Sequence, residues 1–222
     1  MFAFQTSRTP LFYRLIGLSL VLLTLSSKPQ ADTSNDWLMN AAIIGAIGSL
    51  GYACYEGQAP CSFNPSLNTD KLTLSYDIGA DDTIQNNRLA LGADWQEPLF
   101  DNARFRIGGR WEINANYWYS TRKDPDESNG YIVGLTPVFH YLWKAGRYNP
   151  YLELGGGPQY LSSATIENEF KSTQFQFGSL LGLGVESDRF EIGYRYLHIS
   201  NANIELPNPG TDFHNLHLGY KF

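Results

Sequence analysis

The chain lacks the features that would assign it to several common classes of protein. Its 222 residues include only 2 cysteines, too few for a disulfide-rich scaffold or a cysteine-rich metal site. The 16 basic and 22 acidic residues give a net charge of −6, which argues against a nucleic-acid-binding protein. The mean hydropathy of −0.28 excludes a polytopic helical membrane protein. Hydrophobic residues still make up 43% of the chain, enough to bury a core, so we also exclude intrinsic disorder.

The apolar run at residues 15–25 is too short to cross a membrane as a helix, which takes about 20 residues. It follows Arg8 and Arg14, and no acidic residue occurs before it. A basic segment followed by a short apolar run is typical of a secretory signal peptide. We therefore predict that residues 1–31 are a signal peptide. Cleavage after Ser27 is a second option, and an uncleaved anchor is the alternative.

From residue 72 onward, apolar and polar residues alternate with a period of two. Leu72, Leu74 and Tyr76, for example, alternate with polar residues. Such alternation is typical of strands with one apolar and one polar face. The eight segments that show it span residues 72–78, 88–95, 104–119, 131–143, 151–163, 173–186, 190–200 and 213–222. We therefore predict an all-β domain over residues 71–222.

Charged residues on the polar face decide between two all-β architectures. A soluble sandwich or lipocalin-like barrel points its apolar face inward, whereas a transmembrane barrel points it outward. The polar face carries Arg104, Arg106, Arg110, Glu112, Glu153, Glu186, Glu191 and Arg195. These opposite charges can pair inside a narrow lumen, whereas a soluble core would hold them at too high a cost. We therefore expect an eight-stranded antiparallel transmembrane β-barrel.

Aromatic residues also favour a membrane barrel. The apolar faces end in Tyr117, Tyr119, Tyr131, Tyr141, Trp143, Tyr160, Tyr220 and Phe222. These residues would form the two girdles at the membrane interfaces. The chain stops on Phe222 after alternate apolar residues, which resembles the C-terminal signal strand of bacterial outer-membrane barrels. We therefore expect outer-membrane lipids and the barrel assembly machinery, acting through Phe222, among the partners.

The lengths of the links between strands predict the orientation of the barrel, because outer-membrane barrels have short periplasmic turns and longer extracellular loops. Three short links are expected to be periplasmic, at residues 97–102, 144–150 and 187–189. Four longer links are expected to be extracellular, at residues 80–87, 122–130, 164–171 and 203–211. Side chains fill the interior of an eight-stranded barrel, so we do not expect a pore.

Residues 32–70 form an N-terminal extension in this interpretation. Residues 38–53 are apolar and rich in small side chains, but too few to span a membrane as a helix. We expect either a periplasmic helix at the base of the barrel or a segment that enters the lumen. Export would bring Cys54 and Cys61 into an oxidising compartment, where we expect a disulfide, with two free thiols as the alternative.

The strand at residues 190–200 carries two polar residues on its lipid-facing side, His198 and Ser200. They lie eight and ten residues beyond Phe190, about 26 to 33 Å along the strand at roughly 3.3 Å per residue, and hence near its extracellular end. The same parity on the last strand reaches Asp212. These residues could form a triad in which a base activates a serine and an acid orients the base. The alternative is a girdle histidine and a rim serine that bind water.

A motif extends around these residues. The sequence His-Ile-Ser-Asn-Ala at 198–202 leads to Asn-Pro-Gly at 208–210 and a final aromatic strand. Residues 175–178 and 182–184 look like the penultimate hairpin of the same pattern. Together these residues resemble the lipid A 3-O-deacylase (PagL-like) family of outer-membrane esterases, over roughly residues 72–222. The resemblance implies an eight-stranded barrel with its active site on the lipid-facing exterior.

The resemblance also implies a role for each residue of the site. His198 would be the base and Ser200 the nucleophile, with the oxyanion hole near Asn201 and Ala202. The family acid is usually a glutamate fourteen residues after the histidine, and Asp212 holds that position here.

Aspartate is one methylene shorter than the glutamate of the family, so Glu205, in the preceding loop, is a rival for the role of the acid. The resemblance implies a serine esterase that removes the 3-O-linked hydroxyacyl chain of lipid A in a Gram-negative outer membrane. It implies no cofactor, no metal and no nucleic-acid partner, and a homodimer is left open. The alternatives are a non-catalytic barrel, such as an adhesin, and another lipid enzyme, such as a phospholipase or a palmitoyltransferase.

Overall fold

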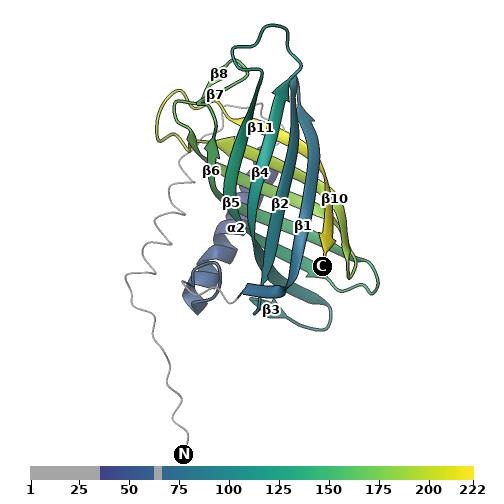
Figure 1. Cartoon of the computed structure of the whole chain (residues 1–222). Coiled ribbons are helices and arrows are strands. Elements are labelled where there is room, and N and C mark those ends of the chain that lie inside the picture. Colours follow the sequence, from purple (N-terminus) through teal and green to yellow (C-terminus); the bar gives the residue numbers. More distant parts are fainter. Residues whose placement is uncertain (1–35, 63–66) are drawn as a thin grey trace, which may run out of the picture.

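The computed structural model describes residues 36–62 and 67–222, so the predicted signal peptide lies outside the described residues. Eight long antiparallel strands make up most of the described chain. They are β1 (Leu67–Asp81), β2 (Ile84–Trp95), β4 (Phe105–Ser120), β5 (Asn129–Trp143), β6 (Asn149–Leu161), β9 (Phe175–Glu186), β10 (Phe190–Ser200) and β11 (Thr211–Lys221). Each pairs with the next in the chain, and β1 pairs with β11, which closes the barrel (Figure 1). The predicted eight-stranded barrel is confirmed.

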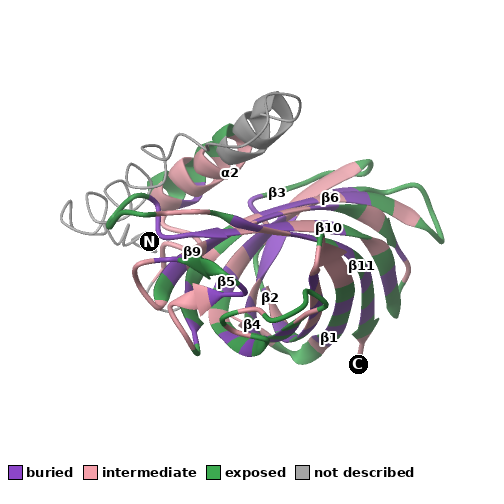
Figure 2. Cartoon of the chain, turned by 90° about the horizontal axis from the view of Figure 1, so that it is seen from above, coloured by how far each residue is buried: buried purple, intermediate pink, exposed green. Residues whose placement is uncertain are grey.

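Burial alternates along the strands as the sequence predicts. In β11, Asn215 and His217 are buried while Leu216 and Leu218 are exposed. Figure 2 shows the same alternation of buried and exposed residues along several strands of the ring. The apolar face therefore points outward and the polar face fills the lumen, as in a transmembrane barrel.

Exposed aromatic side chains mark both ends of the outer wall. Tyr117, Tyr131 and Tyr160 lie toward the extracellular ends of their strands, and Trp143 and Tyr220 toward the periplasmic ends. Amphipathic rings of this kind are stable at the depth of the lipid headgroups. They define two girdles that fix the height of the barrel in the membrane.

The periplasmic half of the lumen holds a network of buried ion pairs. Arg110 contacts Glu112, Glu153 and Glu191 at N···O distances of 2.9, 2.5 and 3.0 Å. Arg195 contacts Glu112 and Glu153 at 3.0 and 2.8 Å. All five side chains are at most 3% exposed. Each guanidinium offsets the cost of burying several carboxylates in a region of low dielectric constant.

The residues that form this ion-pair network are not all those that the sequence predicts for the lumen. Arg104 is exposed and not in the lumen, because β4 begins only at the next residue, Phe105. Arg106 is half-buried at the periplasmic opening of the lumen. Asp77 and Arg88, which the sequence analysis did not count, form a buried ion pair at 2.9 Å.

The extracellular half of the lumen is packed with apolar side chains. They are Ile84, Trp118, Ile132, Leu161, Leu180, Leu197, Ile199 and Phe213, and the cluster extends down to Val138, the strand partner of Arg110. Ile166 joins them from a short hairpin of β7 (Thr165–Ile166) and β8 (Glu169–Phe170), within the loop between β6 and β9. The hairpin lies at the extracellular end of the barrel (Figure 1). Side chains therefore occupy both halves of the lumen.

The prediction of an extracellular loop at residues 80–87 is wrong. Strands β1 and β2 stay paired up to Asp81 and Ile84, so only a tight turn joins them. The turn between them includes Asp82 with φ of 45°, a left-handed conformation that aspartate tolerates. Asn86 is polar because it faces the lumen, where it is fully buried. The other three extracellular loops lie at the expected end, at residues 121–128, 162–174 and 201–210. The periplasmic links are also at the expected end, with a short β3 (Phe100–Asp101) in the first of them.

The N-terminal extension forms a 21-residue helix, α2 (Asp36–Glu56). Figure 2 shows it outside the ring of strands, against the outer wall and not in the lumen. Ser49 shares a hydrogen bond with the hydroxyl of Tyr141, which is therefore half-buried, unlike the other girdle residues. Gly45 lies against Leu154, where a Cβ would come within 2.9 Å of Cδ1. No helix in the described part of the chain is long and apolar enough to cross a membrane.

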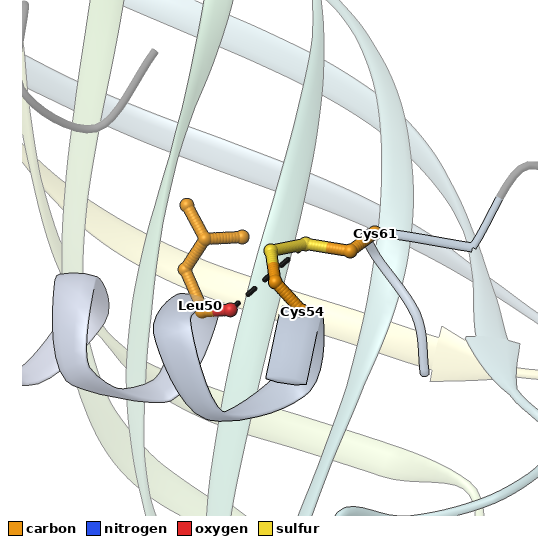
Figure 3. Close-up of a disulfide and its surroundings, with 3 residues drawn as sticks. All are labelled: Leu50, Cys54 and Cys61. Carbon is orange, nitrogen blue, oxygen red and sulfur yellow. Dashed lines mark hydrogen bonds between the residues drawn. A yellow bond between two sulfur atoms is a disulfide. The ribbon is translucent and has the colours of Figure 1, made fainter. Parts of the chain in front are cut away.

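A disulfide between Cys54 and Cys61 closes the turn that follows α2, as expected (Figure 3). It lies beside Ala53, which is fully buried in an apolar cluster with Trp95 and Phe139 on the outer wall. The disulfide therefore fixes the end of the helix at the point where it packs against the barrel.

We expect Gly45→Leu to detach α2 from the wall, because the added side chain would collide with Leu154. Overpacking costs about 1–3 kcal/mol, enough to shift the docking equilibrium by about tenfold. The measurement is the rate of chymotrypsin cleavage at Tyr52 and Tyr55 in detergent micelles. Gly48→Leu is the matched control, since nothing lies within 4 Å of a Cβ there. Equal cleavage rates in the two variants would contradict the packing of α2.

Candidate active site

His198 and Asp212 face each other across β10 and β11, whose antiparallel register pairs them directly. Nδ1 of His198 lies 2.6 Å from Oδ1 of Asp212. The two side chains are 26% and 30% exposed, and they lie on the outward-facing side of the wall. A carboxylate at this distance holds the proton on Nδ1, which leaves Nε2 of the imidazole as a proton acceptor.

Ser200 is the last residue of β10 and has the same parity as His198. Ile199, between them, points the opposite way and is buried in the lumen cluster. Ser200 is 8% exposed. The two residues are about 6.6 Å apart along the strand, at roughly 3.3 Å per residue. In the described part of the chain, no hydrogen bond joins the Ser200 hydroxyl to the imidazole. Such bonds are often long before substrate binds.

The loop after Ser200 is held by hydrogen bonds to Asn201, which is fully buried. Its backbone N–H donates to Oδ1 of Asn208 at 2.8 Å. Its side-chain Nδ2 donates to the carbonyl oxygens of Lys171 and Glu205. The backbone N–H and the side-chain amide of Asn201 are therefore both occupied. The next residue, Ala202, has φ of 55°, so the chain turns sharply there.

The two rival acids have different surroundings. Asp212 contacts the imidazole, whereas Glu205 contributes its backbone carbonyl to the loop and exposes its side chain. The Asp212 carboxylate reaches the ring because its strand pairs directly with that of the histidine. The shorter side chain therefore does not prevent the contact.

Residues 208–210 approach the site from the other side. A Cβ at Gly210 would lie 2.5 Å from Cε1 of His198, so any larger residue at this position would displace the ring. Asn208 binds the loop after the serine, as described above, and also donates to Oδ1 of Asn203. The sequence predicts no role for Asn208 or Gly210 beyond their place in the motif. An Asn-Pro-Gly sequence indicates a turn, and the roles of its side chains depend on contacts made in the fold.

A family model described as lipid A 3-O-deacylase (PagL) matches residues 86–221. The chain belongs to this family. The lipid A deacylase PagL of Bordetella bronchiseptica is 32% identical over 195 residues, covering 82% of this chain and 97% of the relative. The lipid A deacylase PagL of Pseudomonas aeruginosa is 27% identical over 131 residues, covering 58% of this chain and 73% of the relative.

A crystal structure of the outer membrane enzyme PagL superposes with a TM-score of 0.59 at 25% identity, covering 68% of this chain and 98% of that structure. The PagL family match extends from β2 to the end of β11 and includes every residue of the candidate site. This PagL-family chain is an outer-membrane β-barrel enzyme. Among its described residues, no group of three or more His, Cys, Asp or Glu residues could hold a metal ion.

Proposed function

We propose that this protein is a serine esterase that hydrolyses the 3-O-linked hydroxyacyl ester of lipid A. The observation that carries the proposal is the hydrogen-bonded pair of His198 and Asp212 on the outer wall, with Ser200 on the same face of β10. An outward-facing site receives a lipid substrate laterally from the leaflet in which it lies. The family of the chain identifies lipid A as that substrate.

The proposed reaction follows from the arrangement of the three side chains as acid, base and nucleophile. Nε2 of His198 takes the proton of the Ser200 hydroxyl as the oxygen attacks the ester carbonyl. Asp212 stabilises the imidazolium that forms. The imidazolium then protonates the departing 3-oxygen of the sugar, which leaves an acyl-serine. Water, deprotonated by the same imidazole, hydrolyses the acyl-serine, releases the hydroxy fatty acid and returns the serine hydroxyl.

The negative oxygen of the intermediate needs donors close to Ser200. The backbone N–H of Ala202 is the better candidate, because the described residues offer it no hydrogen-bond acceptor. The N–H of Asn201 already donates to Asn208 and would have to exchange that bond for the substrate oxygen. Each such donor contributes about 3 kcal/mol to transition-state stabilisation in well-studied hydrolases.

We further propose that the barrel assembly machinery binds the end of β11 through Phe222, which is 57% exposed. The residue follows the alternating outward residues Leu218 and Tyr220 on the lipid-facing side. Phe222 follows directly after β11, and its exposed ring is accessible to a partner.

The experiment for the proposed activity incubates the purified protein in detergent micelles with lipid A and with glycerophospholipid. The products are identified by mass spectrometry. We expect lipid A to lose one hydroxyacyl chain and the phospholipid to stay intact. Release of fatty acid from the phospholipid alone would indicate a phospholipase. Gain of a chain on lipid A would indicate an acyltransferase.

Asp212→Asn is expected to lower kcat by about 10⁴-fold, because an amide no longer holds the tautomer of His198 or stabilises its charge. Glu205→Gln is the matched control and should retain the wild-type rate, since its exposed side chain does not contact the imidazole. The measurement is the initial rate of hydroxyacyl release from lipid A. A large loss in the Glu205 variant with none in the Asp212 variant would reverse the assignment of the acid.

A further inference from the structure

Lys171 is a buried cation beside the candidate site that sequence reasoning did not identify. It lies between β8 and β9, in the loop at residues 162–174, and its side chain is 1% exposed. Its Nζ donates to Oε2 of Glu169 at 2.6 Å, to the carbonyl oxygen of Pro209 at 2.9 Å and to that of Gly210 at 3.0 Å. An ammonium has three protons, and here each has an acceptor.

These contacts reach both sides of the candidate site. The two carbonyl groups belong to the backbone that lies against the imidazole, where a Cβ at Gly210 would approach His198 to 2.5 Å. The carbonyl oxygen of Lys171 itself accepts the hydrogen bond from Nδ2 of Asn201, the residue after Ser200. One residue therefore connects the segment that packs on the base to the segment that follows the nucleophile.

Burial of this cation costs free energy, and the surroundings of Lys171 only partly offset that cost. Burial lowers the pKa of the Lys171 ammonium, while the carboxylate of Glu169 favours the charged form. Glu169 is 53% exposed, so this ion pair is screened by solvent and contributes little to stability. An apolar side chain would be cheaper to bury, but it could not hold two backbone carbonyls. The contacts with Pro209 and Gly210 are thus the specific consequence of a lysine at this position.

We propose that Lys171 is a positioning residue for ester hydrolysis, which sets the distance between His198 and Ser200 by holding residues 209–210 against the imidazole. The inference rests on the proposed function. Direct binding of a lipid A phosphate by the ammonium is a different role. It is disfavoured because the group is buried and its three protons are already donated.

The first test compares kcat and KM of Lys171→Met with those of Lys123→Met, an exposed lysine in a different extracellular loop. We expect kcat of the Lys171 variant to fall by about 10²-fold, the cost of misplacing catalytic groups by about 1 Å. KM should be unchanged, and so should the mobility shift of the folded barrel on unheated gels. The Lys123 variant should match the wild type in all three.

A chemical rescue separates positioning from folding. Lys171→Cys is alkylated with 2-bromoethylamine in urea, with the disulfide kept intact, and refolded in micelles, which rebuilds an ammonium of nearly the same length. Alkylation with iodoacetamide gives the neutral control. We expect the aminoethyl form to recover most of the lost kcat and the neutral form to recover none.

Three results would overturn the positioning role. The first is a wild-type kcat in Lys171→Met, and the second is a raised KM with unchanged kcat, which would indicate phosphate binding. The third is that only ammonium-bearing forms fold, which would make Lys171 a folding residue. The Ser200→Ala variant tests the proposed function separately. If the proposed function were wrong, this variant would hydrolyse the ester at the wild-type rate, whatever the result for the Lys171 variants.

Discussion

Ser200→Ala and His198→Ala should each lower the rate of hydroxyacyl release from lipid A by at least about 10⁴-fold. The serine supplies the oxygen that forms the acyl intermediate, and the imidazole removes its proton. Loss of either group stops the same step. The double variant should therefore be no slower than either single variant, since residues that act as a unit are not additive. Mass spectrometry of the lipid A product measures all three.

Matched controls distinguish chemistry from damage to the barrel. Ser187→Ala alters a serine in a periplasmic turn, at the far end of β10. His214→Ala removes the outward-facing histidine of β11, whose Nδ1 contacts the hydroxyl of Tyr194. Both should retain activity, and all variants should show the gel mobility of a folded barrel. A Ser200→Ala protein that still releases one hydroxyacyl chain would exclude this serine as the nucleophile.

The outward position of the candidate catalytic residues could be predicted because a strand has a period of two. Once Ile192 and Tyr194 face lipid, parity places His198 and Ser200 on the same side. Parity alone does not predict the cross-strand partner of His198, because the register of a hairpin is not fixed while the length of its loop is unknown. The pairing of His198 with Asp212 follows from the ten-residue loop at residues 201–210, whose length no local pattern determines.

Other parts of the site could not be predicted, since they depend on contacts between distant loops. Lys171 lies 27 residues before His198 in the chain, and nothing in its neighbours separates a buried lysine from a solvated one. The same limit explains the error at residues 80–87. A polar residue such as Asn86 has the same local signature in a loop and in a polar lumen. The placement of α2 on the outer wall is a third case, because its small residues suit any close contact.

Removal of one partner from the ion pairs of the lumen leaves buried charge uncompensated, so we expect Arg110→Met to lower the free energy of unfolding by about 3–5 kcal/mol. Arg110 neutralises Glu112, Glu153 and Glu191 at distances up to 3.0 Å, and all four side chains are buried. Without the guanidinium, these carboxylates keep their charges close together inside the lumen, with only Arg195, Lys221 and their other partners to compensate them. Urea unfolding in detergent micelles, followed by tryptophan fluorescence, measures the change.

Arg104→Met is the matched control for the loss of stability in Arg110→Met. Arg104 has the same side chain, but it is exposed and lies just before the start of β4. Its removal should leave the urea midpoint unchanged. Adding Glu191→Gln to Arg110→Met should recover part of the stability, since the carboxylate that loses its contact with Arg110 is then neutral, although Glu191 also pairs with Lys221. The double variant could instead lose more free energy of unfolding than the losses of the two single variants added together. In that case lost packing would account for the effect. Unpaired charge would then not be the cause.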